Sequence, residues 1–282
     1  MSEYYGLPTV KAPVWTWEIP AYFFVGGAAG AAAVIASAAR MAGASTELVR
    51  DARWVAAAGA ALSPPLLIAD LGRPERFVNM LRVFKLQSPM SVGAWTLVAF
   101  STAAAAAAAA DLVDRASAGR IPVRVIGNAA ETLAAATGLA LSTYTGVLIG
   151  ATTIPVWAAN VRVLPVHFGM SGMGSAASIL ELLGHTDPAL NVVAAGAAVV
   201  ETLTGISIEL RGSEALVPLR ESTSGTITRI GGVLSGPVPL ALRVLGRRSM
   251  TARRTAAVST IAGSLLTRFA WMAAGRESAR RT

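Results

Sequence analysis

Three long stretches of the chain contain no charged residue, and this feature constrains the fold more than any other. They cover residues 19–39, 86–110 and 132–161. A helix needs about 20 consecutive apolar residues to cross the hydrocarbon core of a bilayer. Hydrophobic residues make up 54% of the chain and charged residues 14%, whereas a soluble domain carries about 25% charged residues. An alanine-rich soluble bundle would share the hydrophobic fraction but not the uncharged stretches. The sequence therefore predicts an all-α integral membrane protein.

We expect about eight transmembrane helices in a bundle, forming one domain over residues 1–282. The spans are placed near residues 19–40, 52–70, 92–112, 128–151, 160–183, 188–210, 226–244 and 254–275. The seventh span is short and contains several glycines and prolines. It crosses the bilayer only if the flanking Arg229 and Arg243 extend their side chains to the headgroups.

An even number of spans places both termini on the same side of the membrane. The loop at residues 243–254 is rich in arginine, and the positive-inside rule assigns such a loop to the cytoplasm. We therefore expect extracytoplasmic termini. The net charge of +8 is expected to contact membrane lipid headgroups and to set the topology, and we expect no nucleic-acid partner.

The chain contains no cysteine and two histidines, His167 and His185. Disulfides and iron–sulfur clusters both need cysteine, so neither is expected in this chain. A di-haem cytochrome b needs two axial ligands for each haem, usually histidines. His167 and His185 fall near opposite ends of the fifth span, too far apart to share one haem. We therefore expect no haem.

Several polar residues fall near the membrane face that receives the termini. They are Glu18, Tyr22, Asp70, Tyr144 and His167. Polar groups at membrane depth are costly and often functional. Together they would form an apolar pocket with polar tips, which suits a quinone headgroup that needs hydrogen-bond donors and a proton-exchanging group. Two other interpretations stay open: a tyrosine near a membrane face is often an interfacial anchor, and a lone histidine in a helix is often a packing residue. We assign Trp157 to the anchor class.

Three further charged residues lie deeper. Glu201 and Arg268 fall near the middle of the sixth and eighth spans, and Glu131 lies towards the opposite face in the fourth. Glu201 and Arg268 could form a structural ion pair, or they could belong to a proton route that also uses Asp70 and Glu131. The sequence slightly favours the structural pair.

The longest polar connection covers residues 68–95. Gly72 and Pro74 end the second span, because both are poor helix formers. Residues 75–85 then combine apolar and basic side chains at helical spacing, which predicts an amphipathic helix on the extracytoplasmic surface. It either lies on lipid or serves as a docking platform for a soluble subunit. The basic residues that would contact a partner are Arg73, Arg76, Arg82 and Lys85.

Several motifs resemble the NrfD/PsrC family, the membrane subunits of polysulfide-reductase-type complexes. The resemblance covers roughly residues 4–180, and the block at residues 68–95 carries it most specifically. The matching motifs are YYGLP, WTWEIPAYFFVGGAAG, DLGRPERFVNMLRVFK, SPMSVGAW, STYTG followed by IPVW, and LPVHFGMSGMGSA.

The resemblance implies eight helices, a site for menaquinone or ubiquinone near the outer face of the cell (inner) membrane, and no haem or cluster in this subunit. It implies two partners, a four-cluster ferredoxin-like iron–sulfur subunit and a molybdopterin catalytic subunit. Tyr144 matches the family tyrosine that hydrogen-bonds quinone, Glu18 matches a polar position lining the site, and Asp70 lies near an acidic position linked to proton movement. Some members have a histidine near position 21. This chain has Ala21 followed by Tyr22, and Tyr22 is the candidate replacement.

The function expected from these features is that of a quinone-reactive membrane subunit of an oxidoreductase complex, not catalytic alone. Two alternatives remain. A secondary transporter would place its site at broken helices near the membrane centre, and the seventh span with Glu201 and Arg268 fits that description. A purely structural anchor would follow if the polar residues near the terminal face are inert.

Overall fold

The computed structural model of the protein describes residues 10–246 and 249–281, apart from the side chain of Ser222. The described chain consists of helices joined by short connections and contains no strand. The elements are α1 (Glu18–Met41), α2 (Thr46–Asp70), α3 (Glu75–Leu81), α4 (Pro89–Ala116), α5 (Arg124–Gly150), α6 (Pro155–Ala158), α7 (Leu164–Leu182), α8 (Pro188–Leu210), the 3₁₀-helix η1 (Glu214–Leu219), α9 (Ser222–Ser235), α10 (Pro237–Leu245) and α11 (Met250–Arg280).

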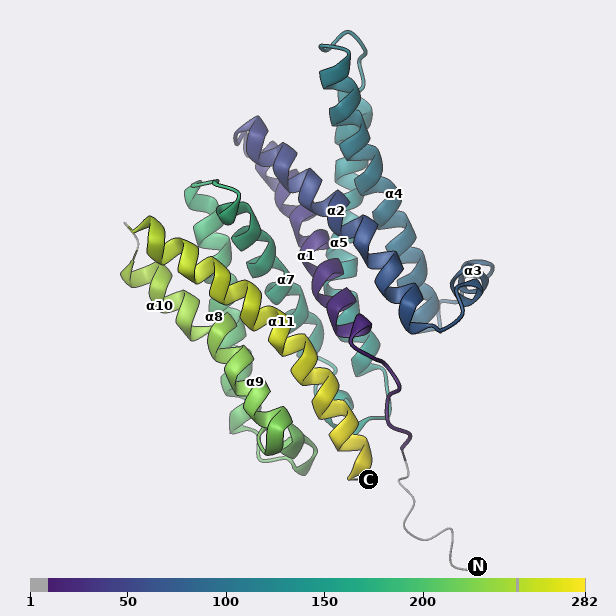
Figure 1. Cartoon of the computed structure of the whole chain (residues 1–282), viewed down its shortest axis with the longest axis vertical. Helices are drawn as coiled ribbons and strands as arrows, with labels where there is room; N and C mark the ends of the chain where they lie inside the picture. The colour runs from purple at the N-terminus through teal and green to yellow at the C-terminus, as the bar shows by residue number, and fades with distance from the viewer. Residues whose placement is uncertain (1–9, 247–248, 282) are drawn as a thin grey trace, which may run out of the picture.

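The long helices form two groups that lie side by side (Figure 1). The first group contains α1, α2, α4 and α5, and the second contains α7, α8, α9, α10 and α11. Helix α1 joins them, because it packs against α2 and α5 in its own group and against α7 and α11 in the other. Glycines allow this close packing. A Cβ atom at Gly30 would lie 2.3 Å from the backbone oxygen of Gly138 on α5, so these two helices touch backbone to backbone.

Five helices are long and apolar enough to cross a membrane: α1, α2, α4, α5 and α8. The chain is therefore a multi-pass membrane protein. Helix α11 has 31 residues, but Arg253, Arg254 and Arg268 lower its hydropathy. Helix α7 has 19 residues and is rich in serine and glycine. The total of eight spans stays a prediction, because α7, α11 and the expected span at residues 226–244 are not among these five helices.

The seventh expected span, at residues 226–244, consists of two helices. Helix α9 ends at Ser235 and α10 begins at Pro237. Gly236 between them has φ −105° and ψ −95°, which is not a helical conformation, and Pro237 has no N–H to continue the hydrogen-bond ladder. A Cβ atom at Gly236 would lie 2.8 Å from Thr202 Oγ1 of α8. The break therefore lies directly against α8.

Crossing by this span was expected to require that Arg243 extends to the headgroups, and Arg243 does not meet this condition. Arg243 is 1% exposed and donates from Nη1 to Glu181 Oε1 at 2.9 Å and to Asn191 Oδ1 at 3.1 Å. Arg253 donates to the same Glu181 oxygen at 2.9 Å. The arginine turns inward because a buried carboxylate on α7 balances its charge.

The connection between α2 and α4 contains a shorter helix than expected. Helix α3 covers seven residues, Glu75–Leu81, rather than residues 75–85, and none of its residues is buried. The backbone bends at Arg82 and Val83 instead of continuing. The segment projects beside the start of α4 (Figure 1).

Trp157 is not an interfacial anchor, contrary to the assignment from sequence. Its side chain is fully buried and stacks on Trp15, with ring centroids 5.8 Å apart. Its indole N–H donates to the backbone oxygen of Trp271 at 2.9 Å, and a Cβ atom at Gly275 would lie 2.1 Å from its ring. Trp157 thus connects the segment before α1 to the end of α11, and the described chain begins and ends at the same end of the molecule.

Candidate functional site

Tyr144 and Tyr22 meet inside the first helix group. Tyr144 lies near the end of α5 and Tyr22 in the second turn of α1, and they are 9% and 3% exposed. The two side chains are close enough to interact electrostatically. Their burial argues against interfacial anchors, because an anchor keeps its polar tip in the headgroup layer.

A glycine on α4 creates the space for the Tyr144 side chain. A Cβ atom at Gly93 would lie 2.2 Å from Tyr144 Cε1 and 2.7 Å from its hydroxyl oxygen. The phenol ring therefore lies directly on the α4 backbone, where any larger residue would displace it. Tyr144 Oη is buried and has no hydrogen-bond partner in the described part of the chain. The arrangement leaves one phenol donor in an apolar environment without a protein acceptor.

Glu18 and Asp70 come together at the same end of α1 through Thr16. The Thr16 backbone N–H donates to Asp70 Oδ1 at 2.9 Å, and its hydroxyl contacts the same oxygen at 3.1 Å. The Thr16 hydroxyl also contacts Glu18 Oε2. Two carboxylates therefore contact one hydroxyl at the end of the helix group where α1 begins, one turn of α1 from Tyr22. Four of the five residues predicted to line a pocket lie at this end of the group.

His167 turns away from the tyrosines. Its Nδ1 lies 3.0 Å from Thr204 Oγ1 on α8, and its ring packs 6.4 Å from the Trp271 ring on α11. Phe168 lies on the other side, with its ring 6.3 Å from Phe23 of α1. The described contacts of His167 therefore belong to the second helix group.

His167 begins a buried polar row along α7. Its other members, spaced three or four residues apart, are Ser171, Ser175, Ser178 and Glu181, and all five are at most 5% exposed. Residues at this spacing lie on one helix face. Ser171 Oγ lies 2.6 Å from Ser264 Oγ of α11, and Ser178 Oγ accepts from Arg243 Nη2 at 3.2 Å. The row follows α7 along its length.

Glu201 and Arg268 lie beside this row without forming a direct ion pair within the described residues. Glu201 is 3% exposed, lies next to Ser171 and Ser235, and its Oε2 has no hydrogen-bond partner. Arg268 is 1% exposed and donates from Nη2 to the Phe168 backbone oxygen at 2.9 Å. Its Cζ lies 3.7 Å from the Phe168 ring centroid, a cation–π geometry, while Nε and Nη1 have no partner. The expected ion pair is thus replaced by two separate buried charges with unused hydrogen-bonding atoms.

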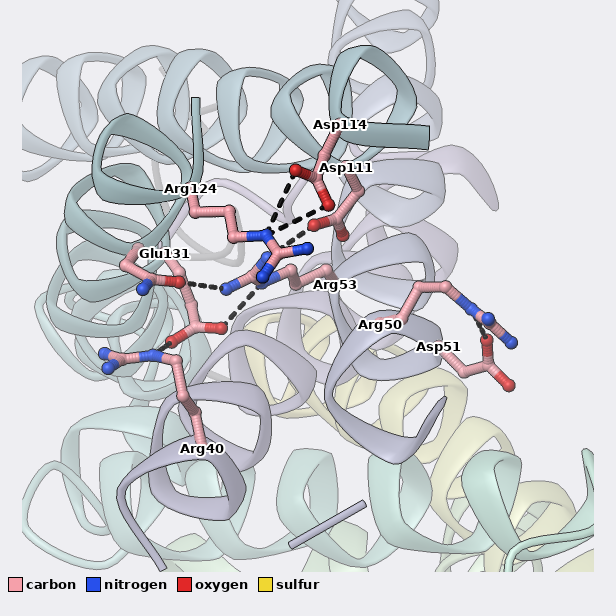
Figure 2. Close-up of polar contacts among 9 residues, drawn as sticks. Arg40, Arg50, Asp51, Arg53, Asp111, Asp114, Arg124 and Glu131 are labelled. Atoms are coloured by element: carbon pink, nitrogen blue, oxygen red, sulfur yellow. Dashed lines mark hydrogen bonds and ion pairs between the residues drawn. The ribbon is translucent and has the colours of Figure 1, made fainter. Parts of the chain in front are cut away.

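Glu131 lies at the opposite end of the first helix group, where two arginines contact its carboxylate (Figure 2). Its Oε1 accepts from Arg40 Nε at 2.5 Å and its Oε2 from Arg53 Nε at 2.7 Å. Arg40 is in the last turn of α1 and Glu18 in the first, so these ends are roughly 33 Å apart at about 1.5 Å per residue. The four residues predicted for proton transfer therefore occupy three places: Asp70 at the tyrosine end, Glu201 and Arg268 beside α7, and Glu131 at the far end.

Arg53 is the centre of this far cluster, and the sequence analysis missed it. It donates to Glu131, to Asp111 Oδ1 at 2.5 Å and to Asn128 Oδ1 at 2.8 Å, and it is 9% exposed. A signal for the pair was present in the sequence, because Arg53 and Glu131 have opposite charges and lie equally far into helices that start at the same end. The Glu181–Arg243 pair was missed as well, since its members lie 62 residues apart.

The four basic residues predicted to dock a partner are exposed. Arg73, Arg76, Arg82 and Lys85 lie in or around α3, and Arg76 Nη1 donates to the Leu71 backbone oxygen at 3.2 Å. Apolar side chains on the same connection are exposed too: Val78, Val83, Phe84 and Leu86. The connection therefore presents a mixed basic and apolar surface at the end of the molecule that holds Asp70.

A comparison with protein-family models supplies one match over nearly the whole chain. The family is described as "Polysulphide reductase, NrfD", and residues 8–277 match it. The match extends well beyond the motifs of the first 180 residues and includes α8 to α11. A search of curated proteins gives no match.

Proposed function

The chain belongs to the NrfD family, whose members are membrane subunits of multi-subunit redox complexes, and on that premise we propose that it exchanges electrons between a membrane quinone and an iron–sulfur partner subunit. The quinone, menaquinone or ubiquinone, would bind beside Tyr144 and Tyr22. The chain contains no cysteine, so the clusters that deliver or accept electrons would belong to the partner, itself linked to a molybdopterin catalytic subunit.

The observation that carries this proposal is the unpartnered Tyr144 hydroxyl. It is buried against Gly93, where no group of the described chain accepts its proton. The carbonyl oxygens of a quinone become stronger acceptors as they gain negative charge during reduction. A fixed donor in a low-dielectric site stabilises that charge more than water does. The Tyr144 hydroxyl would thus supply a hydrogen-bond donor to a quinone oxygen as that oxygen gains negative charge.

Proton exchange requires an ionisable group near the same ring. Glu18 and Asp70 share the Thr16 hydroxyl at the mouth of the helix group, which places two carboxylates between the tyrosines and the outside. They are suited to pass protons between the quinone and water. The exposed basic residues Arg73, Arg76, Arg82 and Lys85 follow Asp70 directly along the chain, and we propose that they dock the iron–sulfur subunit close to the pocket.

A second part of the proposal concerns proton movement along α7. The buried hydroxyl row beside Glu201 and Arg268 contains polar atoms without partners, including Ser175 Oγ and Glu201 Oε2. The helix break at Gly236 packs against Thr202, the residue after Glu201. Discontinuous helices near buried carboxylates are the sites where transporters bind coupling ions. These features favour a proton route through the second helix group, with Glu131 as a separate group at the far end of the first.

The proposal is tested by binding. Purified protein is titrated with heptyl-hydroxyquinoline N-oxide, a fluorescent quinol analogue, and quenching is compared with that of the Gly93→Leu variant. A leucine at position 93 fills the space of the Tyr144 ring, so we expect wild-type quenching to saturate and the variant to bind at least tenfold more weakly. Gly196→Leu is the matched control, because a Cβ atom there meets nothing within 4 Å. Equal binding by all three proteins would refute a quinone site at Tyr144.

A further inference from the structure

A cavity opens between two helix hairpins at the end of the molecule opposite Tyr144. One hairpin is α1–α2 and the other is α4–α5, which extends further than the first (Figure 1). The cavity has a volume of about 490 Å³, within the range of small-molecule sites. The charged residues of its lining are Arg40, Arg50, Arg53, Arg115, Arg124, Asp111 and Asp114.

Positive charge dominates this lining, because five arginines face two aspartates. Arg53 is fully engaged with Glu131, Asp111 and Asn128 and holds the floor of the cavity together (Figure 2). Arg124 pairs with Asp114, at 3.1 Å and 3.2 Å. These contacts join neighbouring helices. They do not account for the remaining arginines of the lining.

Two arginines keep most of their donors unused. The Arg115 side chain makes no hydrogen bond or ion pair within residues 10–246 and 249–281, although its backbone oxygen accepts from the Ala118 N–H at 3.1 Å. Arg50 contacts Asp51 of its own helix through Nε at 3.0 Å, and its two terminal nitrogens have no partner among the described groups. Guanidinium groups gathered around a concave space are the usual protein site for a phosphate, which they can bind through paired N–H donors.

The depth of the cavity indicates where such a phosphate would come from. Arg40 lies in the last turn of α1, a helix of 24 residues. At about 1.5 Å per residue this helix is roughly 36 Å long, longer than the hydrocarbon core of about 30 Å. The cavity therefore lies at the level of lipid headgroups, where phosphodiesters are the most abundant anions.

A carboxylate in the cavity narrows the choice of headgroup. Asp111 Oδ2 is buried and has no hydrogen-bond partner in the described chain. A phosphodiester without hydroxyls offers this oxygen only repulsion, whereas a headgroup that also carries hydroxyls can donate to it. We propose that the cavity binds the headgroup of an anionic phospholipid of the phosphatidylglycerol type, with its phosphate on Arg50 and Arg115 and a glycerol hydroxyl on Asp111.

The test is lipid retention by the full-length chain. The protein is purified in detergent, exchanged into mixed phosphatidylglycerol and phosphatidylcholine nanodiscs, released, and examined by native mass spectrometry. We expect wild-type protein to retain phosphatidylglycerol in preference to phosphatidylcholine. The Arg50→Gln/Arg115→Gln variant should bind it at least tenfold more weakly, since each charged hydrogen bond contributes about tenfold. Arg254→Gln removes an exposed arginine on α11 and should retain lipid as the wild type does.

Two further measurements keep the outcomes distinct. A thermal melt of each purified variant that matches the wild type shows that the variant is folded. Inorganic phosphate is then added during release. If it displaces the lipid, the site belongs to free phosphate and the lipid assignment is overturned. No preference for phosphatidylglycerol in wild-type protein, or equal loss in Arg254→Gln, would overturn the proposal altogether.

Discussion

Replacing Tyr144 with phenylalanine should change stability and quinone activity in opposite directions. The substitution keeps the ring on Gly93 and removes only the hydroxyl. Because Tyr144 Oη is buried without a partner, its removal relieves a desolvation cost of about 1–3 kcal/mol in the quinone-free protein. We therefore expect Tyr144→Phe to assemble normally and to unfold at the same temperature as the wild type or a higher one.

The same hydroxyl would donate to a quinone oxygen that carries developing charge. Such a hydrogen bond contributes about 1.5–3 kcal/mol, which corresponds to roughly ten- to a hundredfold in rate. The assay compares two activities of the intact complex: quinone-linked turnover, and reduction of an artificial dye at the catalytic subunit. We expect the first to fall by this factor and the second to stay unchanged.

The neighbouring residue provides the matched control. Thr145 Oγ1 is also buried without a partner, and the residue is fully buried. Thr145→Val removes a hydroxyl of the same kind from the same helix at nearly constant volume, and it should leave quinone-linked turnover intact. The reasoning is refuted if Tyr144→Phe keeps full quinone activity, or if Thr145→Val loses as much.

Three further predictions concern the other sites. Arg53→Ala removes the partner of Asp111 Oδ1 and leaves the buried Glu131 with Arg40 alone, so it should lower the free energy of unfolding by about 3–5 kcal/mol. The exposed Arg120→Ala should change it by less than about 1 kcal/mol, and equal thermal melts of the two variants would contradict this. Glu201 has no direct ion pair to lose, so we expect Glu201→Gln to keep normal thermal stability. Turnover should be slower, or proton uptake in vesicles should fall. A loss of stability without a change in turnover would favour a structural role. Charge reversal at Arg76 and Arg82 should release the iron–sulfur subunit from membranes at moderate salt while the chain stays inserted, and unchanged co-purification would show that this segment only lies on lipid.

The helix positions were largely predictable because uncharged runs have clear ends. The first span was expected at residues 19–40 and α1 covers Glu18–Met41. The sixth was expected at 188–210, where Pro188 begins and Leu210 ends α8. The position of the break in the seventh span was not predictable, because glycine and proline are common both in membrane helices and at helix breaks. Only the contact of Gly236 with Thr202 on α8 distinguishes the two cases, and that contact is tertiary.

The level of each candidate site residue along its helix was predictable, but the direction in which its side chain points was not. Glu18, Tyr22, Asp70 and Tyr144 lie at one end because helix lengths fix which residues share a level. His167 shares that level, yet its side chain points to Thr204. The direction in which a helix faces depends on its neighbours, and an alanine-rich helix shows no clear apolar stripe that would reveal it. The pairing of Arg243 with Glu181 escaped prediction for the same reason.

The stack of Trp15 on Trp157 has a consequence for the order in which the protein can mature. Residues just before α1 hold Asp70 through Thr16, and Trp15 is held by Trp157, whose indole is fixed by Trp271 near the end of α11. The position of the Trp15–Thr16 segment therefore depends on a residue of α11, a helix that is synthesised after α1 to α10. A chain that has inserted α1 to α10 still lacks this contact, so the segment that holds Asp70 is fixed in place only when α11 has packed against Trp157.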